Sequence, residues 1–256
     1  MTDFYTAIMA RSSVRDYVPE PIAPEQREAL EAMCAEATVP FGGRVRIVLA
    51  GFADGATRSP GTYGVIHGAR DYFVVATDGT PEAKLSAGFA FERIVLGATA
   101  MGLGTCWLAA TFRGTPFARA AALEEGMEVT AVSPVGVASG RHHLLERLTR
   151  TLVRESSRKP FDALFQGATE RFGRALEAVR RAPSSVNSQP WRAVVRDGRV
   201  DFYYAGRSNC VMLDMGIALC HFALVCAQDG VEGSFGVLPE PPESGGNTYL
   251  RSYFIK

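Results

Sequence analysis

The chain has 256 residues, 47% of them hydrophobic and 21% charged, so it can bury a substantial core as one large domain or as two closely packed halves. Lys and Arg together number 27, as do Asp and Glu, and the resulting formal charge of zero argues against a nucleic-acid-binding protein and favours small neutral or anionic ligands. The five cysteines show no C-x-x-C spacing, and the N-terminal residues lack an apolar run of signal-peptide length, so we expect reduced thiols in a cytoplasmic protein.

Helices and strands alternate over the first 139 residues. In chain order the pattern predicts a helix over 3–10, a helix over 25–36, strands over 45–52 and 69–77, a helix over about 83–101, and strands over 105–112 and 129–139. The most apolar stretch, 86–110, approaches membrane length, but Glu92 and Arg93 interrupt it. We therefore expect a buried helix that runs into a strand, and no membrane partner.

The second part of the chain repeats features of the first. Residues 29–48 align without a gap to 175–194 and share the opening ALEA, while 85–107 parallel 213–235 with matched leucines and glycines. Between these blocks, RDYFVVA from Arg70 parallels VDFYYA from Val200. We interpret the three matches, which occur in the same order, as an internal duplication with copies over 1–165 and 166–256.

Each copy keeps polar residues that the other lacks. The first copy alone has ARSSVRDY, in which Arg11 and Arg15 lie one helical turn apart with Ser12 and Ser13 between them. Two cations on one face and a hydroxyl suit an anionic ligand, although a solvated helix end has the same composition.

The second copy alone has the polar loop APSSVNSQPW, which contains Pro183, Ser184, Ser185 and Asn187. Proline starts a turn, and the short polar side chains bond either to their own backbone, as a capped turn, or to the edge of a ligand. Complementary remnants of this kind predict one site per chain, assembled from both copies.

The runs AIMARSSVRDY, GLGTCWLAA and APSSVNSQPW together are similar to the nitroreductase family of FMN-dependent oxidoreductases, in which R-R-S-x-R and P-S-S-x-N-x-Q-P-W are signature runs. In the ordinary family both signatures lie in one copy, whereas here they lie in different copies. The resemblance is therefore to tandem, single-chain members. It implies an α+β nitroreductase-like fold, with a mixed sheet, flanking helices and two intertwined copies that form an internal pseudo-dimer, compatible with a monomer.

The resemblance also implies roles for the first-copy motif. Arg11 would bind the phosphate or ribityl region of FMN, Ser13 the ribityl chain or the ring edge, and Arg15 the N1–C2 carbonyl side of the ring. Ser12 stands where many members have a second arginine, which weakens the anion site.

Further residues complete the implied FMN site. Ala109 and Ala110 occupy the place where the family presents backbone N–H groups near the flavin N5, and Arg158, more than Lys159, resembles the family's C-terminal phosphate-binding basic residues. From the second copy, Pro183, Ser184, Ser185 and Asn187 would close over the ring.

Tyr63 and Gly64 belong to the segment 61–69, which only the first copy retains. They would approach the pyrimidine edge of the flavin, and a type II turn in P-G-T-Y-G explains the same residues.

The implied activity is two-electron transfer from NADH or NADPH to a nitroaromatic, a quinone or a similar acceptor. The cofactor performs the redox chemistry, so no catalytic residue is expected. A flavin-binding protein without turnover, used as a sensor or carrier, and an oxygen-dependent enzyme that consumes flavin are alternatives. A zinc site at His142 and His143, or at Cys220, His221 and Cys226, is disfavoured, because adjacent side chains on one helix point in different directions.

Overall fold

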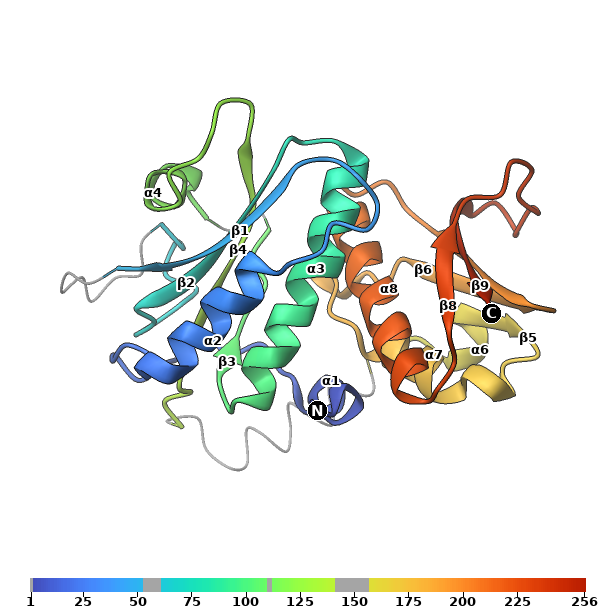
Figure 1. The fold of residues 1–256 in the computed structure, drawn as a ribbon, viewed down its shortest axis with the longest axis horizontal. Coiled ribbons are helices and arrows are strands. Elements are labelled where there is room, and N and C mark those ends of the chain that lie inside the picture. Colours follow the sequence, from blue (N-terminus) through green and yellow to red (C-terminus); the bar gives the residue numbers. More distant parts are fainter. Residues whose placement is uncertain (1, 53–60, 110–111, 141–156) are drawn as a thin grey trace.

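Two β-sheets lie on either side of a layer of helices (Figure 1). The computed structural model describes residues 2–52, 61–109, 112–140 and 157–256. Within these ranges the helices are α1 (Phe4–Ala10), α2 (Pro24–Ala35), α3 (Pro81–Ala100), α4 (Gly114–Ala120), α6 (Phe161–Leu164), α7 (Gly173–Arg181) and α8 (Val211–Gln228), with short 3₁₀ turns at Glu170–Phe172 and Ser185–Asn187. The expected α+β class is confirmed.

The first sheet has the order β1-β2-β4-β3, and all of its described pairs are antiparallel. Its strands are β1 (Val45–Gly51), β2 (Asp71–Thr77), β3 (Gly104–Thr105) and β4 (Glu128–Gly136). The second sheet has the order β5-β6-β7-β9-β8. Its strands are β5 (Phe165–Gly167), β6 (Trp191–Arg196), β7 (Arg199–Tyr204), β8 (Gly233–Gly236) and β9 (Thr248–Ile255). Among the strand ladders of the described residues, β5 and β6 are the one parallel pair, so the sheets have little of the expected mixed character.

The strand expected over 105–112 is much shorter than predicted. Only Gly104 and Thr105 pair with β4 as a ladder. At Cys106 the backbone N–H donates to the Ser133 hydroxyl instead of a strand carbonyl, and among the described residues of this segment the pairing resumes as an isolated bridge at Leu108. A side-chain acceptor has therefore replaced the ladder at the point where the chain leaves the sheet.

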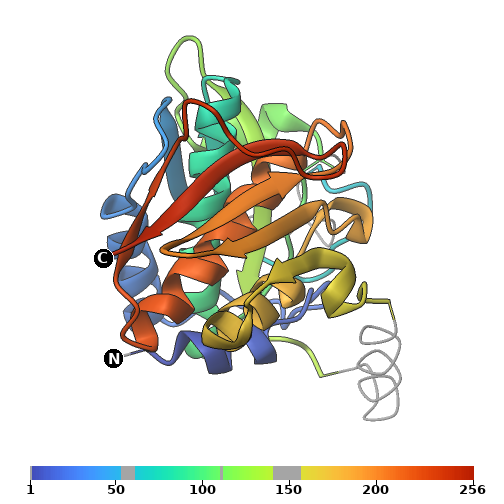
Figure 2. The ribbon, with the colours of Figure 1, turned by 90° about the vertical axis from the view of Figure 1, so that its right-hand side faces the viewer.

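The two longest helices, α3 and α8, cross at the centre of the molecule, between the sheets (Figures 1 and 2). A Cβ atom on Gly88 would clash with the carbonyl oxygen of Leu213, and one on Gly216 would clash with the carbonyl oxygen of Leu85. The contact is reciprocal, because the glycine of each helix packs directly against the backbone of the other helix. α8 is long and apolar enough to cross a membrane, but 78% of it is buried in the core, which accounts for its composition.

The two sheets have corresponding strand orders and registers. Arg46 lies opposite Ala76, and Arg192 lies opposite Tyr203. A ladder irregularity falls directly before Ala76 in one sheet and directly before Tyr203 in the other. With Arg46 taken as the counterpart of Arg192, equivalent residues of β2 and β7 are 127 positions apart. The sequence match of RDYFVVA with VDFYYA implied a spacing of 130 positions between equivalent residues of β2 and β7. The strand pairing corrects this spacing to 127.

Candidate functional site

The polar motif that follows α1 runs along the short strand β3. Ser13 bridges to Thr105 in parallel fashion, and the Val14 backbone N–H donates to the Thr105 carbonyl at 2.9 Å. Gly104 makes this approach possible, because a Cβ atom there would lie 2.7 Å from the Val14 side chain. The motif is thus an extension of the first sheet and is held by its backbone.

Ser13 and Arg15 of this motif lie close to the thiol of Cys106. Ser12 and Arg15 are exposed and Ser13 is half-buried. Burial raises the pKa of the Cys106 thiol above its ordinary value, while the nearby Arg15 charge and a hydrogen bond with Ser13 act in the opposite direction. The buried hydroxyl of Thr105 has no hydrogen-bond partner among the described residues. The motif and β3 therefore offer a ligand the Arg15 cation and the Thr105 hydroxyl, which is unpaired within the described ranges.

The segment 61–69, which only the first copy has, packs against the same motif. The His67 backbone N–H donates to the Arg15 carbonyl at 2.8 Å, and the Tyr17 N–H donates to the His67 carbonyl at 2.9 Å. Tyr63 and Gly64 both have positive φ, 48° and 76°, and both are exposed. The tyrosine is a left-handed turn residue, which is uncommon for a non-glycine.

The second-copy loop Pro183–Gln189 adopts a conformation that its residues do not favour locally. Val186, Asn187 and Gln189 have positive φ values of 46°, 57° and 48°. For β-branched Val186, whose side chain is 96% exposed, this is a strained conformation that the surroundings must impose. Part of the imposition is internal, because the Gln189 N–H donates to the Ser184 hydroxyl at 3.0 Å.

Arg158 and Lys159 hold this serine loop from outside. Arg158 donates to the carbonyls of Arg181 and Ala182, where α7 ends, at 3.1 and 2.7 Å. Lys159 donates to the carbonyls of Ser188 and Gln189 at 2.7 and 3.2 Å. The structure thus brings both predicted basic residues to the predicted loop, where they donate hydrogen bonds to backbone carbonyls.

Other bonds in the same region complete the loop's attachment. The Asn187 amide donates to the Ser157 carbonyl at 3.1 Å. Burial, and then the charge of Arg192, lower the pKa of the Lys159 amine. The loop is consequently fixed against the segment that begins at Ser157.

Asp214, in the first turn of α8, anchors the loop from inside, and sequence reasoning missed it. One carboxylate oxygen accepts from the Ser185 backbone N–H at 3.0 Å, and the other lies 3.4 Å from the Ser188 hydroxyl. The residue is only 4% exposed, and burial raises its pKa to about 7. A polar residue at the start of an otherwise apolar helix was the available signal.

Arg11 and Arg15 do not share a helix face as expected, because α1 ends at Ala10 and the motif continues in extended form. The Arg11 side chain is 3% exposed, and its Nε atom is 3.9 Å from the carboxylate of Glu92, which is fully buried in α3. Arg15 is therefore the exposed arginine of the motif, and Arg11 belongs to the interior. Glu92 was visible in the sequence only as an interruption of an apolar helix.

Ala109 is half-buried and packs against the core beneath the first sheet. Ala110, together with His142 and His143, lies outside the described residues. No group of three His, Cys, Asp or Glu side chains in the described part of the chain could hold a metal ion.

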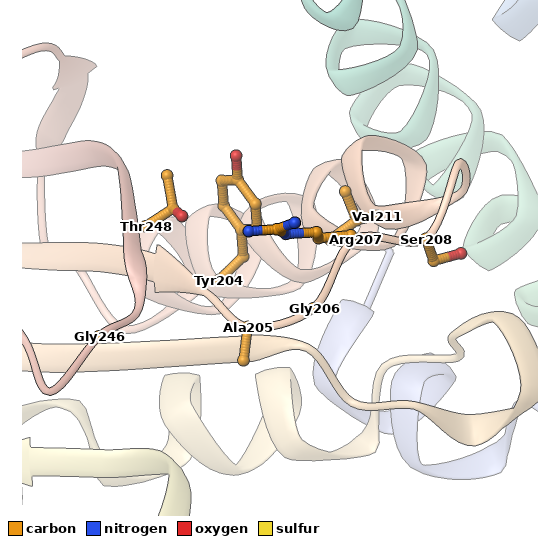
Figure 3. A pocket seen from close by; sticks show the side chains of 8 residues that line it. All are labelled: Tyr204, Ala205, Gly206, Arg207, Ser208, Val211, Gly246 and Thr248. Carbon is orange, nitrogen blue, oxygen red and sulfur yellow. The ribbon is translucent and has the colours of Figure 1, made fainter.

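A separate cavity of about 440 Å³ opens beside the start of α8 (Figure 3). It is lined by Tyr204, Ala205, Gly206, Arg207, Ser208, Val211, Gly246 and Thr248. Arg207 is exposed and has no ion-pair partner among the described residues. The cavity adjoins the serine loop, because the Ala205 N–H donates to the Pro190 carbonyl at 2.9 Å. None of the residues expected to bind a cofactor lines it.

Known proteins resemble the chain in sequence pattern and in fold. The family model described as "Putative TM nitroreductase" matches residues 3–226. A crystal structure described as a putative nitroreductase from Thermotoga maritima MSB8 is 20% identical with a TM-score of 0.63, over 99% of this chain and 94% of that chain. No curated protein matches the chain. The Thermotoga structure shows that the fold is shared over nearly the whole length.

Two further structures match over about half of this chain. The NADPH:FMN oxidoreductase of Vibrio harveyi, complexed with NAD⁺, is 18% identical with a TM-score of 0.43, over 54% of this chain and 70% of that chain. A nitroreductase with bound FMN from Desulfitobacterium hafniense DCB-2 is 21% identical with a TM-score of 0.42, over 54% of this chain and 91% of that chain.

Proposed function

The chain belongs to the TM nitroreductase family, and from that premise we propose that it is an FMN-dependent oxidoreductase that passes two electrons from NADH or NADPH to an electron-poor acceptor such as a nitroaromatic or a quinone. We propose further that one FMN binds per chain, between the motif Arg11–Arg15 of the first copy and the loop Pro183–Asn187 of the second.

The observation that carries the proposal is the division of polar groups between two similar halves. The motif with Ser13 and Arg15 extends the first sheet, and the serine loop leads into β6 of the second sheet. The reciprocal contact of Gly88 with Gly216 supports an internal twofold arrangement, because these glycines occupy equivalent positions in the aligned helices. In a twofold arrangement each motif is needed once, which accounts for its loss from the other half.

The residues present fit an anionic, planar cofactor with a polar edge. Arg15 is an exposed cation, the Thr105 hydroxyl is buried without a partner in the described part of the chain, and Ser13 is half-buried beside it. Arg158 and Lys159 would add positive charge near the serine loop, suited to a phosphate. When bound, FMN supplies the hydride chemistry.

The protein's own part in the reaction is electrostatic and positional. The backbone of Arg15 is fixed by the hydrogen bond from His67, and its exposed guanidinium would stabilise negative charge that develops beside it. The strained serine loop is held by Asp214 and Lys159, so its Ser184–Asn187 edge is preorganised for a ligand. No proton-transfer residue is required by this scheme.

The proposal is tested by adding FMN to the purified protein and measuring bound flavin per chain and its dissociation constant. We expect one FMN per chain, and we expect Arg15→Ala to weaken binding by about tenfold or more, the usual loss for a charged hydrogen bond. Arg44→Ala, in the loop of the first copy that lacks the serines, is the matched control and should bind like the wild type.

Two FMN per chain, or equal losses from Arg15→Ala and Arg44→Ala, would refute the site. Oxidation of NADH or NADPH that depends on a nitroaromatic or quinone supports turnover. Binding without such oxidation would indicate a sensor or carrier, and loss of flavin absorbance under oxygen would indicate a flavin-consuming enzyme.

A further inference from the structure

The carboxylate of Glu92 is the centre of a buried polar cluster between α3 and α8. His221 Nε2 lies 2.9 Å from Glu92 Oε1, and Trp107 Nε1 donates to Oε2 at 2.7 Å. The guanidinium Nε of Arg11 is 3.9 Å from Oε1. Glu92 and His221 are both 0% exposed, so these contacts form without competing water.

The second ring nitrogen of His221 determines how many protons the cluster holds. Nδ1 lies 2.8 Å from the carbonyl oxygen of Ala178, and a carbonyl only accepts, so Nδ1 must carry a hydrogen. A neutral imidazole has a single N–H, which leaves Nε2 with a lone pair facing the Glu92 carboxylate. Two acceptors at 2.9 Å would repel, so one further proton must lie between Nε2 and Oε1.

The same cluster connects the three segments that the proposed function assigns to the flavin. Arg11 begins the first-copy motif, and Trp107 lies in the segment that leads to Ala109. Ala178 lies in the last turn of α7, which ends at Arg181, shortly before the serine loop. Glu92 on α3 thus contacts Arg11 and Trp107, and His221 on α8 contacts Ala178.

We propose that Glu92 and His221 share one proton in the folded protein, and that this protonated pair is a positioning device that fixes the first-copy motif, the Trp107 segment and the end of α7 relative to one another. Its charged and titratable neighbours in the described part of the chain are Arg11 from the end of α1, Arg93 from α3 and Cys220 from α8. The proton count stands on the geometry alone, whereas the consequence for ligand binding rests on the proposed function.

The proton is tested in the FMN-free protein. In ¹⁵N-histidine-labelled protein at neutral pH, with the signals assigned by their loss in His221→Gln, we expect either two protonated nitrogens on His221 or, in the infrared spectrum, a protonated carboxyl that Glu92→Gln removes. One protonated ring nitrogen together with an ionised Glu92 would overturn the proposal. His67→Gln, at an exposed histidine, is the matched control and should leave the signals of His221 in place.

The positioning role is tested by two substitutions of Glu92 with different consequences. In Glu92→Gln the amide oxygen can still accept from Trp107, and the amide N–H can donate to the lone pair of His221, so the hydrogen bonds survive without the shared proton. Glu92→Leu removes all of them. We expect Glu92→Leu to weaken FMN binding by about tenfold or more and Glu92→Gln to recover most of that loss.

The Trp107 indole N–H resonance should follow the same order, unshifted in the exposed control Glu82→Leu. Wild-type affinity in Glu92→Leu would overturn the positioning role. If Glu92→Leu fails to fold, a Trp107 indole resonance that Glu92→Gln shifts to the position of a free N–H overturns it instead. Failure of the wild type to bind FMN would refute the proposed function, and the proton measurement, which uses no FMN, would stand.

Discussion

Asp214 should make the stability of the protein depend on pH between about 4 and 7. Its pKa rises from the ordinary 3.8 to about 7 because the carboxyl is buried at the start of α8, although it accepts from the Ser185 N–H. Below pH 3.8 both the folded and unfolded states hold the proton. Between pH 3.8 and about 7 only the unfolded state is ionised, so the free energy of unfolding falls as the pH rises. Above pH 7 the loss is complete, at about 4 kcal/mol.

Replacing the carboxyl by an amide should abolish this loss. In Asp214→Asn the amide oxygen still accepts from Ser185, and the amide N–H can donate to the Ser188 hydroxyl. We expect Asp214→Asn to be more stable than the wild type at pH 8 by up to about 4 kcal/mol, with the difference disappearing near pH 4.

Urea unfolding at several pH values between 4 and 8, on protein without cofactor, measures the effect. Asp197→Asn, at an exposed position, controls for the loss of one negative charge and should follow the wild type. Parallel pH profiles of the wild type and Asp214→Asn would refute the reasoning, because they would show that Asp214 ionises alike in the folded and unfolded states.

Three further outcomes follow from the packing. Gly88→Ala should lower the free energy of unfolding by about 1–3 kcal/mol despite the better helix propensity of alanine, because its methyl group meets the backbone of α8. Gly114→Ala is the control, because no atom lies within 4 Å of its added methyl group. Equal urea midpoints for Gly88→Ala and the wild type would contradict this. Lys159→Met should speed hydrogen exchange at the Gln189 amide by releasing two loop carbonyls, and unchanged exchange would mean that the loop holds itself. In the folded protein an alkylating reagent should modify Cys210 before Cys34, because both are half-buried and burial raises the pKa of the Cys34 thiol to about 12. Modification of a fully buried cysteine before Cys210, seen by mass spectrometry, would contradict the packing.

The helices and most first-half strands could be predicted because their signals are local. The helix expected over 83–101 is found at Pro81–Ala100, with Thr80 as its N-cap and Gly102 in the left-handed conformation after it. The strand expected over 105–112 was wrong, because composition cannot reveal that the Ser133 hydroxyl, 27 positions later, takes a backbone hydrogen bond.

The candidate site was predictable in its polar motifs and not in what holds them. The serine loop was recognised from its residue types, but positive φ at Val186 contradicts the preference of a β-branched residue and is imposed from outside. Asp214 is 29 positions from Ser185, and His221 is 129 positions from Glu92. Partners at such separations meet only through the fold, so local patterns contain no signal for them.

The crossing of α3 and α8 has a consequence for how the molecule can be divided. The two halves meet through helix backbone at Gly88 and Gly216. Each half therefore carries its own part of this contact surface, and the contact does not involve the peptide that links the halves. We therefore expect residues 1–165 and 166–256, produced as separate polypeptides, to associate with one another. A larger residue at either Gly88 or Gly216 would then weaken the association of both polypeptides.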